Sequence, residues 1–134
     1  MESNEQTKIT FDDLINAAQK ECWDFVDKNL LTLCNMPENI EWALQKGINN
    51  EDGNLRDLAV SILEKSDYKL SENNLKTLQK LLETDENLYV RFRAAFALFN
   101  KGDKSEIVIK KLKEACENED VKEIAEKYLD KLKS

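Results

Sequence analysis

The stretch DENLYVRFRAAFALFNKGD, residues 85–103, decides the fold class of this chain. Its apolar residues recur at spacings of three and four, and Gly102 follows the last of them. This is the pattern of an amphipathic helix with a glycine at its C-terminal end. Val90, Ala94 and Leu98 stand four positions apart and therefore share one helix face. The small middle residue predicts a close crossing with a neighbouring helix.

The same large–small–large triple occurs twice more, 35 residues earlier and 31 residues later. The two further copies are Leu55, Ala59, Leu63 and Val121, Ala125, Leu129. An Asx residue that can cap a helix stands three positions before each triple: Asp52, Asn87 and Asn118. A basic residue follows each first member: Arg56, Arg91 and Lys122. A unit of this length that recurs predicts helix pairs that stack into a solenoid.

Capping and breaking signals predict about seven helices and no sheet. The expected helices cover Thr10 to about Asn29 with an extension into 30–34, Pro37 to Gly47, Gly53 to Lys65, a segment after Ser71, Leu88 to Lys101, a segment opened by an Asp103–Glu106 capping box, and a segment capped by Asn118. Short connections predict antiparallel neighbours. We expect one domain over residues 1–134, with a tail at 1–9, an N-terminal capping helix at 10–36 and repeats at 37–134.

Residues 85–103 resemble a HEAT repeat, in particular the short kind found in phycobilisome-lyase-type HEAT-like proteins. The resemblance lies in Val-Arg, an Ala pair, Ala-Leu and Gly-Asp, and it covers roughly residues 38–132 in three copies, two of them degenerate. It implies an all-α solenoid that binds proteins, and no reaction. It also implies that Asp85 and Arg91 take part in a ladder of hydrogen bonds between adjacent repeats.

Composition narrows the classes of function. The 134 residues contain no His, which removes imidazole acid–base chemistry and His-ligated zinc. Three Cys without a secretory signal favour free thiols in the cytoplasm, and we expect no metal and no cofactor. The net charge of −7 lies entirely in residues 1–58, so a nucleic acid is not an expected partner. No stretch approaches 18 consecutive apolar residues, so a membrane is not an expected partner either. We expect a non-catalytic protein.

The candidate site from sequence is a stripe of three phenylalanines on the helix over residues 88–101. Phe92, Phe96 and Phe99 share one face, and the matched positions are polar in both sister helices. We therefore expect this face to point to solvent and to bind a partner, with Arg93 at its edge. The alternative is that the stripe is core, either because the N-terminal helix covers it or because the central helix is buried on both sides.

Three functions remain open from the sequence. The first is a protein–protein adaptor or scaffold. The second is an accessory subunit or a lyase-like HEAT protein that acts on another protein. The third is an obligate homodimer that buries the phenylalanine stripe.

Overall fold

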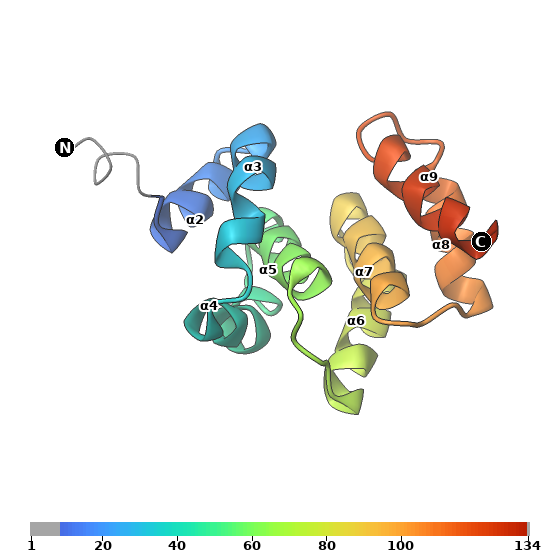
Figure 1. Cartoon of the computed structure of the whole chain (residues 1–134), viewed down its shortest axis with the longest axis horizontal. Helices are drawn as coiled ribbons and strands as arrows, with labels where there is room; N and C mark the ends of the chain where they lie inside the picture. Colours follow the sequence, from blue (N-terminus) through green and yellow to red (C-terminus); the bar gives the residue numbers. More distant parts are fainter. Residues whose placement is uncertain (1–8, 134) are drawn as a thin grey trace. The chain divides into compact units, whose positions relative to one another are not determined.

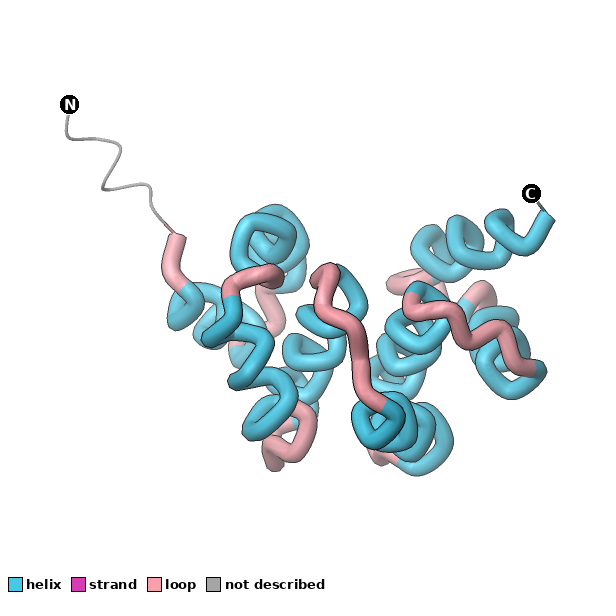
Figure 2. The backbone as a smooth tube through the Cα atoms, turned by 60° about the horizontal axis from the view of Figure 1, so that its bottom comes forward, coloured by secondary structure: helices cyan, strands magenta, loops and turns pink. Residues whose placement is uncertain are grey.

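A computed structural model of the chain describes residues 9–133, and every regular element in that range is helical (Figures 1 and 2). The α-helices are α2 (Phe11–Gln19), α3 (Trp23–Leu33), α4 (Pro37–Trp42), α5 (Gly53–Lys65), α6 (Glu72–Thr84), α7 (Leu88–Asn100), α8 (Glu106–Ala115) and α9 (Lys122–Asp130). A π-helical turn, Ala43–Gly47, continues α4, and a 3-10 turn, Lys131–Lys133, continues α9. The all-α class is confirmed. Residues 1–8 of the predicted tail lie outside the described residues.

The chain divides into two compact units, residues 1–66 and residues 67–134. In unit 1, α5 is the central helix and packs against α2, α3, α4 and the π-helical turn. In unit 2, α6 and α7 form one hairpin, and α8 and α9 form a second (Figure 1). Helix α7 joins the two hairpins because it packs against both α8 and α9.

The predicted first helix is wrong in one respect, because the structure divides it into α2 and α3. The Glu21 backbone has a φ of 61°, in the left-handed region. The N–H of Glu21 donates to the Ala18 carbonyl (3.0 Å) and the N–H of Cys22 donates to the Ala17 carbonyl (2.8 Å). These are the two bonds of a Schellman C-cap. Glycine usually occupies the left-handed position, and a glutamate there left no signal in the sequence.

The predicted start of α2 is confirmed. The Thr10 side chain accepts a hydrogen bond from the N–H of Asp13 (3.3 Å), and the Asp13 carboxylate accepts one from the N–H of Thr10 (2.9 Å). Pro37 occupies the first turn of α4, as expected from its fixed φ. Ser71 caps α6 with a capping box of its own. These caps are local, so the sequence alone was sufficient to place them.

Gly47 is the last residue of the π-helical turn that continues α4, as expected for the end of the second helix, and it also allows a close approach. A Cβ atom at Gly47 would lie 2.5 Å from the Cβ of Ala59 and 2.7 Å from Cζ3 of Trp42. The chain therefore brings the π-helical turn against α5 at a distance that only glycine opposite alanine permits. Ala59, Ala94 and Ala125 are all fully buried, in agreement with their expected place in the core.

One capping network recurs at the start of α5 and of α7. Before α5, the Asn50 side chain accepts a hydrogen bond from the N–H of Asp52 (2.8 Å), and the Asp52 side chain accepts one from the N–H of Asn54 (2.9 Å). The Arg56 guanidinium closes this network by donating to the Asn50 carbonyl (2.8 Å). Together these bonds satisfy groups that a helix end leaves unpaired.

The network before α7 uses the residues 35 positions later. The Asp85 side chain accepts from the N–H of Asn87 (2.8 Å), and the Asn87 side chain accepts from the N–H of Tyr89 (2.9 Å). Arg91 donates to the Asp85 carbonyl. Residues 50–56 and residues 85–91, which match in the predicted repeat, therefore form the same set of hydrogen bonds.

The last two helices begin later than expected. Ser105, and not Asp103, is the N-terminal cap residue of α8, and the Asp103 carboxylate accepts from the N–H of Ser105 (2.9 Å). Helix α9 is capped at Val121, because an extra turn separates it from Asn118. Asn118 caps that turn, since its side chain accepts from the N–H of Asp120 (2.9 Å). The third copy thus keeps the bond that matches those of Asp52 and Asn87, while Cys116 and Lys122 stand at the other two positions of the network.

Candidate functional site

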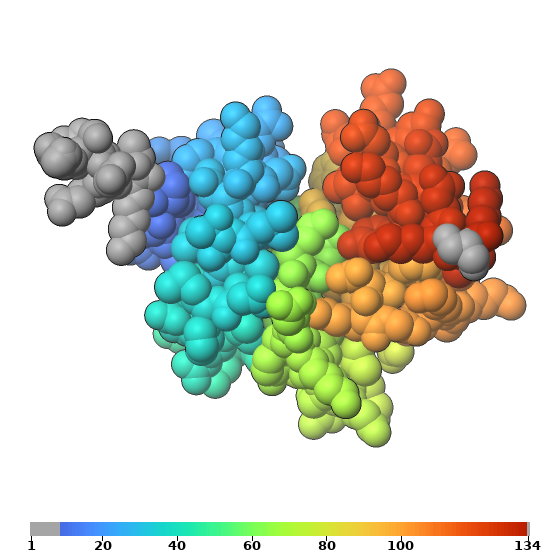
Figure 3. Space-filling model, viewed as in Figure 1, coloured from blue at the N-terminus to red at the C-terminus, as the bar shows by residue number. Residues whose placement is uncertain are grey.

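The phenylalanine stripe is not exposed, so the expectation that this face points to solvent is wrong. Phe92, Phe96 and Phe99 are 4%, 0% and 2% exposed. Tyr128 of α9 lies over two of them, with its ring centroid 5.6 Å from that of Phe96 and 5.6 Å from that of Phe99. Figure 3 shows the red C-terminal part of the chain directly beside the orange segment that follows α7. The core alternative therefore applies, with α9 as the cover.

Cations surround this aromatic cluster. The guanidinium carbon of Arg93 lies 5.5 Å from the centroid of Phe96, and the ammonium of Lys104 lies 4.2 Å from that of Phe99. Lys131 lies 5.1 Å from the centroid of Tyr128. Each cation is attracted by the negative face of a ring. Arg93 therefore lies beside the stripe, and its role at the rim of a partner-binding surface stays a prediction.

The polar residues of α5 and α9 at the positions that match the phenylalanine stripe wrongly indicated that this face is exposed on α7. On α9 the matched residues are exposed, as expected for a solvent face. On α5 the matched residues Asp57, Ser61 and Glu64 are buried. The Ser61 hydroxyl donates to Asp57 (3.4 Å), and the Glu64 carboxylate pairs with Lys65 (3.5 Å). A polar residue at a matched position therefore does not identify the exposed side of a helix here.

Asp85 and Arg91 serve the start of their own helix through the capping network. The ladder between adjacent repeats that the resemblance implies stays a prediction. Within residues 9–133, no group of three or more Cys, Asp or Glu side chains is arranged to hold a metal ion. No helix in that range is long and apolar enough to cross a membrane.

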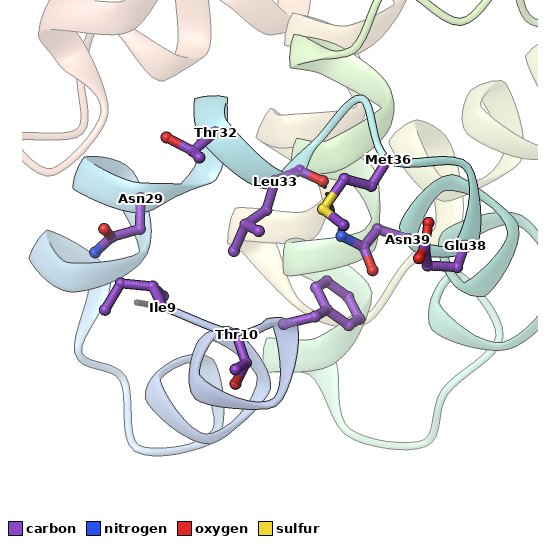
Figure 4. A pocket seen from close by; sticks show the side chains of 9 residues that line it. Ile9, Thr10, Asn29, Thr32, Leu33, Met36, Glu38 and Asn39 are labelled. Atoms are coloured by element: carbon purple, nitrogen blue, oxygen red, sulfur yellow. Dashed lines mark hydrogen bonds between the residues drawn. The ribbon is translucent and has the colours of Figure 1, made fainter. Parts of the chain in front are cut away.

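The site that the structure adds is a pocket in unit 1, where α2 begins, α3 ends and α4 begins (Figure 4). Its volume is about 610 Å³, and its lining is Ile9, Thr10, Phe11, Asn29, Thr32, Leu33, Met36, Glu38 and Asn39. In Figure 4, Leu33 and Met36 approach from one side and Ile9 from the other. Pockets of this size and mainly apolar lining are the usual form of a binding site.

Polar groups hold the walls of this pocket in place. The buried Asn39 side chain donates from Nδ2 to the carbonyl of Leu33 (2.8 Å), which ties α4 to the end of α3. Asn29 donates from its side chain to the carbonyl of Phe25 (2.9 Å) within α3. The Phe11 ring contacts Trp42 edge to face, with centroids 5.1 Å apart. The pocket is therefore preformed, with each wall fixed by a named bond or ring contact.

A second depression of about 480 Å³ extends the pocket along α2 and α3. Ile9 lines both, and the further lining is Asp13, Asn16, Ala17, Lys20, Cys22 and Phe25. We call the two together the α2–α3 groove. Phe25 in one part and Asn29 in the other stand one turn apart on α3, so the same helix face runs through both.

The sequence did not reveal this groove, because it depends on the break at Glu21. A continuous helix over residues 10–29 would leave no second wall. Among the lining residues, Met36 is the one that could have indicated a binding surface. It is a large apolar residue directly before Pro37, and its side chain is 40% exposed. Comparison with models of protein families, with curated proteins and with solved structures finds no match.

Proposed function

We propose that this chain is a protein-binding module without catalytic activity, and that the α2–α3 groove is its binding site. The observation that carries the proposal is the preformed apolar pocket next to the half-exposed Met36. Burial of one such side chain against a partner contributes about 1.5–3 kcal/mol. A few apolar contacts of this kind are sufficient for a micromolar complex once the cost of association is included.

We also propose that the chain is a short α-solenoid of the HEAT-like kind. The capping network at α5 and at α7 supports this, because the same hydrogen bonds recur at an offset of 35 residues. The two hairpins of unit 2 support it further. Proteins built from such repeats commonly use their helical surfaces to bind other proteins, which agrees with the function proposed for the groove.

The experiment uses the full chain and three single variants. Met36→Lys places a charge in the pocket, and Thr32→Trp fills it. Leu31→Lys is the matched control, since Leu31 adjoins Thr32 on α3, does not line the groove and is 68% exposed. Peptides are selected on the wild-type chain from a displayed library of amphipathic helices.

Selected peptides should bind Met36→Lys and Thr32→Trp at least ten-fold more weakly than wild type, a loss of about 1.4 kcal/mol or more. They should bind Leu31→Lys as well as wild type. Circular dichroism establishes that each variant is folded. If the library yields no binder, or if its binders do not distinguish the pocket variants from wild type, the groove is not the binding site.

A further inference from the structure

We infer that the α2–α3 groove binds an amphipathic helix of a partner protein that carries lysine or arginine beside its apolar face. This inference rests on the proposed function and names the chemistry of the partner. It is carried by the shape of the groove, by its apolar floor and by the charge around it.

The walls of the groove favour a helix over an extended peptide. Both walls are helices, whose backbone groups already bond within α2 and α3. An extended peptide gains affinity by pairing its backbone with a free strand edge, and the described residues of unit 1 offer no strand. A helix brings its own backbone bonds and needs only a furrow between two side-chain ridges. From Cys22 to Leu33 the groove wall extends about 16 Å, or about three turns of a partner helix.

The apolar part of the site lies at one end of the groove. Leu33 and Ile9 face each other across the pocket, and Met36 forms part of its rim (Figure 4). An adaptable thioether at the rim suits a surface that accepts apolar side chains of different shape. The partner helix therefore places its largest apolar residue here, and its apolar residues about two turns away lie along Phe25.

The charged residues on the helical segments at the pocket end of the groove are acidic, whereas Lys20 lines the other part of the groove. Glu38 lines the pocket, Glu41 follows one turn later on α4, and Asp12 lies in the first turn of α2. All three are exposed, and none forms an ion pair within residues 9–133. Charges that are unpaired in the free protein attract a partner of the opposite sign.

The two units differ in net charge, and the unit that contains the pocket is the negative one. Unit 1 contains 13 of the 27 acidic residues and 6 of the 20 basic ones, so its net charge is 6 − 13 = −7. Unit 2 contains 14 of each and is neutral. A partner guided by the field of the protein therefore meets the negative unit, and this unit holds the groove.

The test uses a displayed library of 16-residue amphipathic helices (about four turns). Leu, Met and Phe alternate on the apolar face, and the positions beside it draw equally from Lys, Glu, Ser and Ala. Peptides are selected on the wild-type chain and counter-selected on Met36→Lys. We expect Lys to exceed Glu several-fold among the peptides that remain. A synthetic peptide with Lys at those positions should bind about ten-fold more tightly than its Glu counterpart, and added salt should narrow the difference.

Two first-turn glutamates provide matched variants. Glu38→Gln, at the pocket, should weaken the Lys peptide several-fold, and Glu72→Gln, in the first turn of α6 in unit 2, should leave it unchanged. Peptides that need Met36 but contain as much Glu as Lys would overturn the basic partner and leave the proposed function intact. An absence of peptides that need Met36 would overturn both. A wild-type dimer that Met36→Lys dissociates would place a second copy in the groove and would also overturn the inference.

Discussion

The close approach of Gly47 to Ala59 predicts that Gly47→Ala destabilises unit 1. The new Cβ would lie 2.5 Å from the Cβ of Ala59, which is attached directly to the backbone of α5 and cannot move away alone. It would also lie 2.7 Å from the Trp42 ring, which is held by Phe11. Overpacking of this kind costs about 1–3 kcal/mol, and two rigid neighbours favour the upper end. Alanine regains about 1 kcal/mol in helical propensity, so the net loss is about 2 kcal/mol.

The assay is urea unfolding followed by tryptophan fluorescence. Trp23 and Trp42 are the only tryptophans, and both lie in unit 1, so this signal reports on the unit that contains the substitution. The wild-type chain and Gly47→Ala should have similar slopes and different midpoints. Circular dichroism provides a second probe of the same transition, which guards against a direct effect of the new methyl group on the Trp42 fluorescence.

A double-mutant cycle with Ala59→Gly isolates the contact. Ala59→Gly alone should cost about 1 kcal/mol or more, because glycine is a poor helix former and leaves a gap. Together with Gly47→Ala it removes the shorter of the two clashes, so the double variant should be more stable than the sum of the single effects by about 1 kcal/mol. If Gly47→Ala is as stable as wild type, or if the two effects simply add, then the close approach does not limit this packing.

Three further predictions follow from single features. Glu21→Gly should stabilise unit 1 by about 0.5–1 kcal/mol, because glycine adopts the left-handed backbone without strain; an unchanged urea midpoint would contradict this. The hydrogen bond to Asp120 raises the pKa of Tyr89 above its ordinary value of 10.0. The contribution of this hydrogen bond to stability is therefore present below that pH and is lost as the pH rises through the raised pKa. Asp120→Asn should lower the pKa of Tyr89 in an NMR titration, and an unchanged pKa would refute the bond. Phe92→Glu with Phe99→Glu should unfold unit 2, because it removes two buried rings and places two carboxylates in the core; a folded variant by circular dichroism would show that the stripe can reach solvent.

The parts of the fold that sequence reasoning predicted correctly depend on neighbours in the chain. The Thr10 capping box, the Ser71 cap, Pro37 in a first turn and Gly102 at the end of α7 are all signals within a few residues. The predicted range Gly53–Lys65 matches α5 to the residue. Local hydrogen bonding dominates at such positions, and the choice of side chain therefore identifies them.

The parts that were wrong depend on contacts between distant residues or on an unusual local choice. Glu21 takes a conformation that glycine normally marks, so the end of α2 had no visible signal. Tyr128 contacts Phe96 and Phe99 from at least 29 residues further along the chain, and no periodicity within α7 contains that information. The groove was missed for both reasons, because it needs the break at Glu21 and the packing of α4 beside α3.

The capping network at the start of α5 and of α7 has a consequence for how the chain folds. Every bond in it joins groups at most six residues apart, such as the Arg56 side chain and the Asn50 carbonyl. Closing so short a loop costs little entropy, so the network can form before remote segments meet. We therefore expect each unit to have its own nucleation point at the head of a central helix. Each of the helices α5 and α7 can then begin at the same residue as in the folded chain before it contacts other helices, and tertiary packing follows on helices that have already formed.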